Sequence, residues 1–318
     1  MIDGSSCAPH GGRGLVNRIV PETGKEHLLA ACEGRVYRIS DADLSVFHRI
    51  ADGTLSPLEG PMSSGVFHRV LDDEVIESDG GTYAWTIPLA FPVSAADAET
   101  LETGKLAAVV GSDGEPVGAI EIDEIYPFDK QRYNAAVYGT DRNDHPGARI
   151  FGDDPRDHLI GGRIWAFPQS FDPRFARYML SPAEARNLFA ARGWRRIVAF
   201  QTRNALHRAH EYALVHAVEE LTRAGHFAGA VLNPLVGATK SDDVPADVRM
   251  HTYEALLDAG VFGAGDRDEE LWRSAGRDFT DQLIMIGLDM KMYYAGPKEA
   301  VMHAIYRQNF GFTDIVIG

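Results

Sequence analysis

The segment Val198–Glu211, VAFQTRNALHRAHE, places hydrogen-bonding and cationic side chains directly after an apolar run. It contains two arginines, two histidines, a glutamine and an asparagine. The chain as a whole has a formal net charge of −15. A local cationic cluster in such an acidic protein indicates a pocket for an anion rather than a broad basic surface.

The arrangement of this segment predicts where the anion binds. If a strand ends at Phe200 and a helix begins near Ala205, Asn204 lies at or beside the N-cap. The free backbone amides of a helix N-terminus form an anion site. His207 and His210 are three residues apart, so we expect both imidazoles on one face of the first turn, where they can donate to phosphate oxygens.

Gln201 and Arg203 precede this turn and can reach a second anion beside the first. The planar guanidinium of arginine can bind an oxyanion through two parallel hydrogen bonds. A single histidine near a helix start is more often a cap or a core partner than a ligand, and we place His216, His226 and His251 in that category. The combination Gln-Thr-Arg-Asn followed by His-x-x-His is much more specific.

The elements that must position this segment form a strand–helix alternation. A helix is predicted from Ser181 as N-cap, with Pro182 first, Glu184 closing a capping box and Gly193 ending it. Further strands are predicted at 196–200, 229–233, 291–296 and 313–318, and helices at 206–221, 244–260 and 297–311. This pattern predicts a parallel doubly wound sheet, in which ligands bind beyond the carboxyl ends of the strands.

The first half of the chain, to roughly residue 175, has a different pattern. It is rich in turn signals and predicts a small, mostly β barrel or sandwich, with strand-like runs at 35–39, 82–93, 105–110, 116–128 and 135–139. We therefore expect two domains, 1–175 and 176–318. The segment 263–278 is interpreted as a solvated insertion.

Composition limits the possible partners and compartment. The chain has 46 acidic against 31 basic residues, which argues against nucleic acid or an anionic membrane as a partner. The two cysteines, Cys7 and Cys32, lack metal-ligand spacing and favour a reducing, cytoplasmic location. There is no signal peptide pattern and no apolar run of about 18 residues.

FQTRNALHRAHE resembles the signature of the ATP sulfurylase (sulfate adenylyltransferase) family. The resemblance covers nearly the whole chain, including PHGGRGLVNRIV, LSPLEG, HPG at 145–147, SPAEARNLFAARGWRRIVAF, NPLVGATKSDDVP and YYAGPKEAVMHAIYRQNFG. It implies an α/β protein with an N-terminal PUA-like β domain followed by a Rossmann-like nucleotidyltransferase domain. It also implies a homo-oligomer that converts MgATP and sulfate to adenosine 5'-phosphosulfate and pyrophosphate, by in-line attack on the α-phosphate. The physiological direction, including the reverse reaction in sulfur oxidation, stays open.

The resemblance also implies roles for individual residues. Gln201 and Arg203 would bind sulfate, while Thr202, Arg203 and Asn204 would form the catalytic loop. His207 and His210 would stabilise the transition-state phosphates, and Mg2+ would enter with ATP, with no metal site of the protein's own. The residues implied to contact ATP or to line its pocket are Gln201, Thr202, Asn204, Gly318, Thr239, Lys240, Asp242, Asp243 and Lys298.

The sequence departs from the family pattern at two places. Ala205 stands where the family commonly has proline, which predicts a looser loop. In the family, the strand matching 313–318 continues into a Gly-Arg-Asp-His-Ala segment that contacts nucleotide and sulfate. We therefore expect a chain ending at Gly318 to bind ATP weakly and not to turn over, and the natural protein to be longer.

Three alternative functions stay open at this point. Another His-x-x-His adenylyltransferase, such as a pantetheine-phosphate or nicotinamide-mononucleotide enzyme, usually carries its motif very early in a short chain, whereas here it follows some 200 residues. A PUA-like domain can bind RNA, which the acidic composition disfavours. An inactive homologue that keeps the fold as a scaffold is the third.

Overall fold

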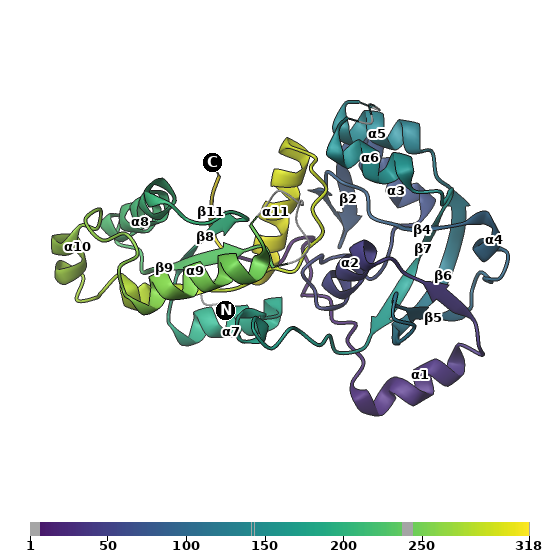
Figure 1. The fold of residues 1–318 in the computed structure, drawn as a ribbon, viewed down its shortest axis with the longest axis horizontal. Helices are drawn as coiled ribbons and strands as arrows, with labels where there is room; N and C mark the ends of the chain where they lie inside the picture. Colours follow the sequence, from purple (N-terminus) through teal and green to yellow (C-terminus); the bar gives the residue numbers. More distant parts are fainter. Residues whose placement is uncertain (1–6, 141, 143, 237–243, 318) are drawn as a thin grey trace. The chain divides into compact units, whose positions relative to one another are not determined.

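The computed structural model describes residues 7–140, 142, 144–236 and 244–317. The chain forms two compact units (Figure 1). The N-terminal unit comprises 9–170 and 291–306, and the C-terminal unit comprises 7–8, 171–290 and 307–317. No helix in the described part of the chain is both long enough and apolar enough to span a membrane.

The N-terminal unit is built on a five-stranded sheet of order β1-β5-β6-β7-β4. Its strands are β1 (Val36–Arg38), β4 (Phe91–Val93), β5 (Leu106–Val110), β6 (Pro116–Pro127) and β7 (His158–Ala166). The β1–β5 pair is parallel and the other pairs are antiparallel. A separate hairpin consists of β2 (Val75–Ser78) and β3 (Gly81–Ala84).

The N-terminal unit contains more helix than its sequence predicts. Its helices are α1 (Lys25–Ala31), α2 (Asp41–Ala51), α3 (Ser64–Asp73), α4 (Ala95–Ala98), α5 (Lys130–Tyr138) and α6 (Pro146–Asp153), preceded by the short 3-10 helix η1 (Glu22–Gly24). The prediction of a strand at 135–139 is wrong, because this run lies in α5 and the turn after it. Asp129 caps α5 by accepting from the Arg132 amide, and Tyr133 and Val137 bury one face at helical spacing.

Strand β7 was not predicted because two glycines interrupt its apolar pattern. A Cβ atom on Gly162 would lie 2.1 Å from the Glu121 carbonyl oxygen of β6. A Cβ atom on Gly161, the other glycine of β7, would lie 2.7 Å from the Met62 carbonyl oxygen. The glycines are therefore required by close backbone packing, which sequence patterns do not reveal.

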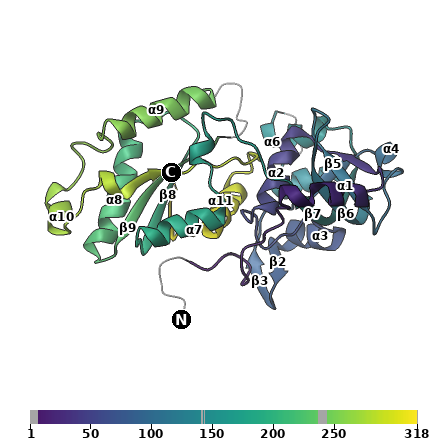
Figure 2. The same cartoon turned by 90° about the horizontal axis from the view of Figure 1, so that it is seen from below.

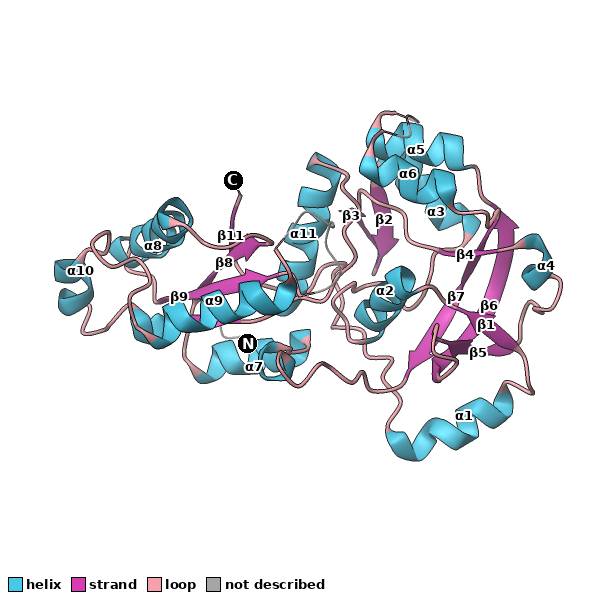
Figure 3. Cartoon of the chain, in the orientation of Figure 1, coloured by secondary structure: helices cyan, strands magenta, loops and turns pink. Residues whose placement is uncertain are grey.

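The C-terminal unit contains the predicted parallel sheet, with strand order β10-β9-β8-β11 and every pair parallel (Figure 3). Its strands are β8 (Arg196–Thr202), β9 (Ala228–Pro234), β10 (Leu283–Met285) and β11 (Asp314–Val316). Three of the four predicted strands are confirmed, but β10 replaces the strand predicted at 291–296. In that segment the Glu299 carboxylate accepts from the Tyr293 and Ala295 amides, and Tyr294 has a left-handed φ of 57°, which prevents an extended run.

The helices predicted for the second half of the chain are confirmed. They are α7 (Pro182–Ala191), α8 (Arg208–Arg223), α9 (Ala246–Asp258) and α11 (Pro297–Phe310), and the capping box of Ser181 and Glu184 is formed. Short helices η2 (Ala176–Tyr178), α10 (Glu269–Ser274) and η3 (Thr280–Gln282) also lie in the C-terminal unit, whereas α11 up to Tyr306 belongs to the N-terminal unit.

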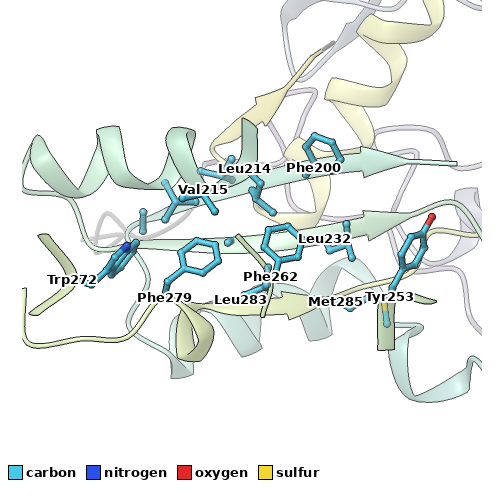
Figure 4. Packing of buried hydrophobic residues seen from close by; sticks show 14 of the residues in the cluster. Phe200, Leu214, Val215, Leu232, Tyr253, Phe262, Trp272, Phe279, Leu283 and Met285 are labelled. Atoms are coloured by element: carbon cyan, nitrogen blue, oxygen red, sulfur yellow. The ribbon is translucent and has the colours of Figure 1, made fainter. Parts of the chain in front are cut away.

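The sheet of the C-terminal unit is covered on both faces, with α7 and α9 on opposite sides (Figure 2). Side chains from α8, α9 and α10 pack with alternate residues of β8, β9 and β10 in one buried cluster (Figure 4). On the other face, Phe189 of α7 stacks on Trp194 at 5.8 Å between ring centroids. Trp194 covers Gly229, where a Cβ atom would lie 2.1 Å from the indole.

Most of the segment 263–278 is exposed, as its interpretation as a solvated insertion expects, but Trp272 anchors it to the core. Trp272 of α10 is buried and its ring meets Phe279 edge-on at 5.5 Å. The buried Glu219 carboxylate accepts from the Trp272 indole at 2.9 Å and from the Asp268 amide at 2.8 Å. The many charged residues of this segment favoured the prediction of a fully solvated loop, and the single buried aromatic residue, Trp272, was overlooked.

Candidate functional site

The sheet topology singles out the loop after β8. The chain runs from β8 to β9 to β10 on one side, then crosses back to place β11 on the other side of β8. In open parallel sheets, ligands bind at the carboxyl ends of the strands where the order reverses. Because β11 is in register with β8 up to the pair Val316 and Phe200, the residues after Phe200 begin at this reversal point.

The first residues of the loop form a tight turn. Gln201 and Thr202 end β8 in register with Asn233 and Pro234 of β9. The Thr202 hydroxyl donates to the Asn204 carbonyl at 2.9 Å and accepts from the Asn204 amide at 3.1 Å. Thr202 is buried whereas the side chain of Asn204 is exposed. The backbone of the Thr202–Asn204 turn is therefore fixed by a buried hydroxyl, while the side chain of Asn204 remains accessible.

Helix α8 begins three residues later than the sequence predicts. Its N-cap is His207, with an extended φ of −138°, and not Asn204. The turn closed by Thr202 and the packing of Leu206 against the core cluster hold the intervening residues out of the helix. The helix N-terminus is still directed to the loop, but its first amides belong to Arg208 and Ala209.

His207 and His210 lie together despite this shift. Their rings stack with centroids 3.7 Å apart and planes 23° from parallel. Burial lowers the pKa of His210, and the neighbouring His207 lowers it further. Nδ1 of His210 is buried and has no hydrogen-bond partner among the described residues. An anion that approaches this pair would raise the pKa of His210 from its lowered value, because negative charge favours the charged imidazole.

The two arginines of the segment differ in their surroundings. Arg208 forms an ion pair with Asp266 and donates to the Ala264 carbonyl at 2.7 Å. Its guanidinium is therefore bound to the segment 263–278. Arg203 lies half-buried in the loop between Thr202 and Asn204. The position of Arg203 in the loop, rather than the number of arginines, therefore makes it the candidate anion ligand.

Several other predicted residues lie elsewhere or outside the description. Thr239, Lys240, Asp242, Asp243 and Gly318 are outside the described residues. Lys298 belongs to the N-terminal unit, where its Nζ pairs with the Glu74 carboxylate at 2.8 Å. The prediction of core or cap roles is wrong for His216, His226 and His251, all of which are exposed. His216 stacks on the exposed Tyr212 at 5.7 Å, and His251 lies 3.9 Å from Glu254.

Sequence reasoning missed two residues that support the loop. Tyr253 of α9 is fully buried, and its hydroxyl donates to the Asn204 carbonyl at 2.5 Å. Arg249 lies one helical turn earlier and is also fully buried. The available signal was the pair of long polar side chains at i, i+4 on the face of α9 that carries Met250 and Tyr253 into the core.

The fold and the loop define a Rossmann-like α/β protein preceded by a PUA-like domain. A family model described as ATP-sulfurylase matches residues 176–318, and one described as PUA-like domain matches residues 7–169. The chain belongs to the ATP-sulfurylase family.

Relatives cover most of the chain. It is 48% identical over 313 residues to the sulfate adenylyltransferase of Pyropia yezoensis, covering 97% of this chain and 73% of that protein. It is 36% identical to the sulfate adenylyltransferase of Synechocystis, covering 99% of this chain and 74% of that protein. Among solved structures it resembles the hexameric APS kinase from Thiobacillus denitrificans, with a TM-score of 0.73, 21% identity, and coverage of 98% of this chain and 52% of that one. The last likeness concerns the fold alone.

Proposed function

We propose that this chain catalyses the sulfate adenylyltransferase reaction, in which MgATP and sulfate give adenosine 5'-phosphosulfate and pyrophosphate. The observation that carries the proposal is the pairing of the Thr202–Asn204 turn with the stacked His207 and His210 at the reversal point of the sheet. The near-full-length similarity to sulfate adenylyltransferases supports the same conclusion.

The chemistry needs positioning and charge stabilisation rather than a side-chain nucleophile. A sulfate oxygen attacks the α-phosphorus, the bond from that phosphorus to the bridging oxygen breaks, and the electron pair leaves with pyrophosphate. Mg2+ enters as part of the MgATP substrate and neutralises the β- and γ-phosphate oxygens.

We assign the loop residues as follows. Gln201 and Arg203 hold sulfate, with the guanidinium as a two-point donor. Thr202 and Asn204 fix the turn and, with Gln201, contact the nucleotide. His207 and His210 donate ring N–H groups to the phosphate oxygens as negative charge shifts toward the leaving group. Gly318 is assigned to the nucleotide from family resemblance.

We further propose the domain limits 1–175 and 176–318, a homo-oligomeric assembly and a cytoplasmic location. The family models end and begin close to that domain boundary. By contacts, however, 291–306 packs with the N-terminal unit. Cys7 and Cys32 are both free thiols, which suits a reducing compartment. Light scattering on the purified protein tests the assembly.

The activity is tested by pyrophosphate release from MgATP, with and without sulfate, using the complete gene product. We expect release that requires both substrates, and ATP formation when phosphosulfate and pyrophosphate are supplied instead. Sulfate-independent release of pyrophosphate would assign the site to a different adenylyl acceptor. Absence of turnover in both directions would favour a scaffold protein.

A further inference from the structure

The buried guanidinium of Arg249 lies between the end of β9 and the start of α9. It is 0% exposed, and its buried Nη2 has no hydrogen-bond partner among the described residues, so the bonds of its other two nitrogens carry the compensation for burying the charge. Its Nη1 donates to the Leu235 carbonyl at 3.0 Å, immediately after β9. Its Nε donates to the Val244 carbonyl at 2.8 Å, immediately before the N-cap of α9. One guanidinium therefore ties the end of β9 to the start of α9.

Tyr253 extends this connection to the catalytic loop. It lies one turn after Arg249 on α9, so the two side chains share a face of the helix. Burial raises the pKa of Tyr253, while side-chain hydrogen bonds from Arg249 and Thr202 act in the opposite direction. The Tyr253 hydroxyl in turn donates to the Asn204 carbonyl at 2.5 Å. Figure 4 shows Tyr253 at the carboxyl end of the strands, apart from the aromatic residues at the other end of the cluster.

The Asn204 carbonyl consequently receives two donors from different elements. One is the Thr202 hydroxyl within the loop, and the other is the Tyr253 hydroxyl on α9. The first bond closes the turn on itself, and the second ties the Asn204 end of the turn to α9, while the Thr202 end is held to the sheet by the Leu235 amide, which donates to the Thr202 carbonyl at 3.0 Å. The hydrogen bonds that Arg249 and Tyr253 donate to the Leu235, Val244 and Asn204 carbonyls all hold backbone.

We infer that Arg249 and Tyr253 are positioning residues for the Thr202–Asn204 turn. By holding this turn they also position the side chain of Arg203, which lies between Thr202 and Asn204. The inference rests on the proposed function, because it assigns these two residues to the same reaction. They act through the loop and touch no substrate. Their role is to hold a donor in the geometry of the transition state, where a misplacement of about 1 Å can cost on the order of 10²-fold in rate.

The test removes the hydroxyl and keeps the ring. Tyr253→Phe leaves the core packing in place but takes one donor from the Asn204 carbonyl. We expect kcat to fall on the order of 10-fold while KM for MgATP and sulfate changes by less than about threefold, because substrate still binds a loop that is less well placed. Arg249→Lys keeps the charge but loses the fork, and should lower kcat similarly.

A matched control is a hydrogen bond between η2 and α9. The Tyr178 hydroxyl of η2 donates at 2.8 Å to the carboxylate of Glu254, the residue that follows Tyr253 on α9, and this bond does not involve the loop. Tyr178→Phe removes a comparable hydrogen bond and should leave kcat unchanged. If Tyr253 acts only on stability, both variants will lose thermal stability and neither will lose kcat. A double variant of Arg249→Lys and Tyr253→Phe should lose less than the product of the two single losses, because both act through one hydroxyl.

Hydrogen–deuterium exchange separates this inference from the proposed function. Amides in 201–207 should exchange faster in Tyr253→Phe than in the parent, and at the parent rate in Tyr178→Phe. If the parent shows no sulfate adenylyltransferase turnover but the 201–207 amides still exchange faster in Tyr253→Phe, the proposed function is refuted while the role of Tyr253 in holding the loop stands. An active parent whose Tyr253→Phe variant keeps the parent kcat would overturn the inference, whatever its exchange rate.

Discussion

Acid should destabilise the N-terminal unit through one buried histidine, His48 of α2. Burial, reinforced by the neighbouring Arg49, lowers the pKa of His48 from its ordinary value of 6.5 to about 4. Its Nδ1 is buried without a hydrogen-bond partner among the described residues, so a proton there gains no acceptor. In the unfolded chain the same imidazole takes up its proton near pH 6.5.

The sign and size of the effect follow from these two pKa values. Between pH 6.5 and 4 the unfolded state binds more protons than the folded state, so stability is full above pH 6.5 and falls as the pH is lowered. Each pH unit in this window costs up to about 1.4 kcal/mol, and the difference between a pKa of 6.5 and one of about 4 gives a total of about 3 kcal/mol. Below pH 4 both states are protonated and the loss stops. The carboxylates of Asp43 and Asp154, whose pKa values are lowered, act only at more acidic pH.

The assay is urea unfolding at pH 7.5, 6.5, 5.5 and 4.5 on the parent and on His48→Gln, which cannot titrate. The parent should lose about 2 kcal/mol more than the variant between pH 7.5 and 4.5. His216→Gln, at an exposed position, serves as the matched control and should follow the parent. Equal pH dependence in parent and His48→Gln would refute the assignment of the acid sensitivity to His48.

Three further outcomes are expected. Arg203→Lys should lower turnover on the order of 10²-fold, whereas Arg208→Lys, which alters an exposed ion pair, should change turnover by less than about threefold. Steady-state kinetics on both variants measures the difference. Parent-like turnover in Arg203→Lys would remove Arg203 from the site. His207→Ala and His210→Ala should each reduce turnover on the order of 10²-fold with little change in thermal midpoint, and a large loss of stability with turnover preserved would assign them to the core instead. Gly229→Ala should destabilise the C-terminal unit by about 1–3 kcal/mol in urea, because the new methyl group meets an indole ring, and an unchanged midpoint would show that the ring moves aside freely.

Local signals were sufficient for much of the C-terminal unit. The capping box at Ser181, the apolar run of β8 and the helical spacing in α8 each act within a few residues, and all three are confirmed. The location of the loop 201–204 at the carboxyl edge of the parallel sheet was also predictable, because a loop that follows a parallel strand lies at the edge where ligands bind.

Non-local contacts explain what sequence missed. The aromatic run 291–296 has strand-like composition, but the carboxylate of Glu299 on α11 accepts from its Tyr293 and Ala295 amides, six and four residues earlier. Gly162 is required by a strand far from it in sequence. Arg249 and Tyr253 are ordinary helix residues until folding brings them beneath the loop. Each of these depends on a partner that periodicity does not identify.

The most direct test of the account is sulfate-dependent pyrophosphate release from MgATP by the complete gene product, measured beside Arg203→Lys and Tyr178→Phe. The account predicts release only when sulfate is present, loss on the order of 10²-fold in Arg203→Lys, and parent activity in Tyr178→Phe. Pyrophosphate release that does not depend on sulfate, or that survives unchanged in Arg203→Lys, would contradict it.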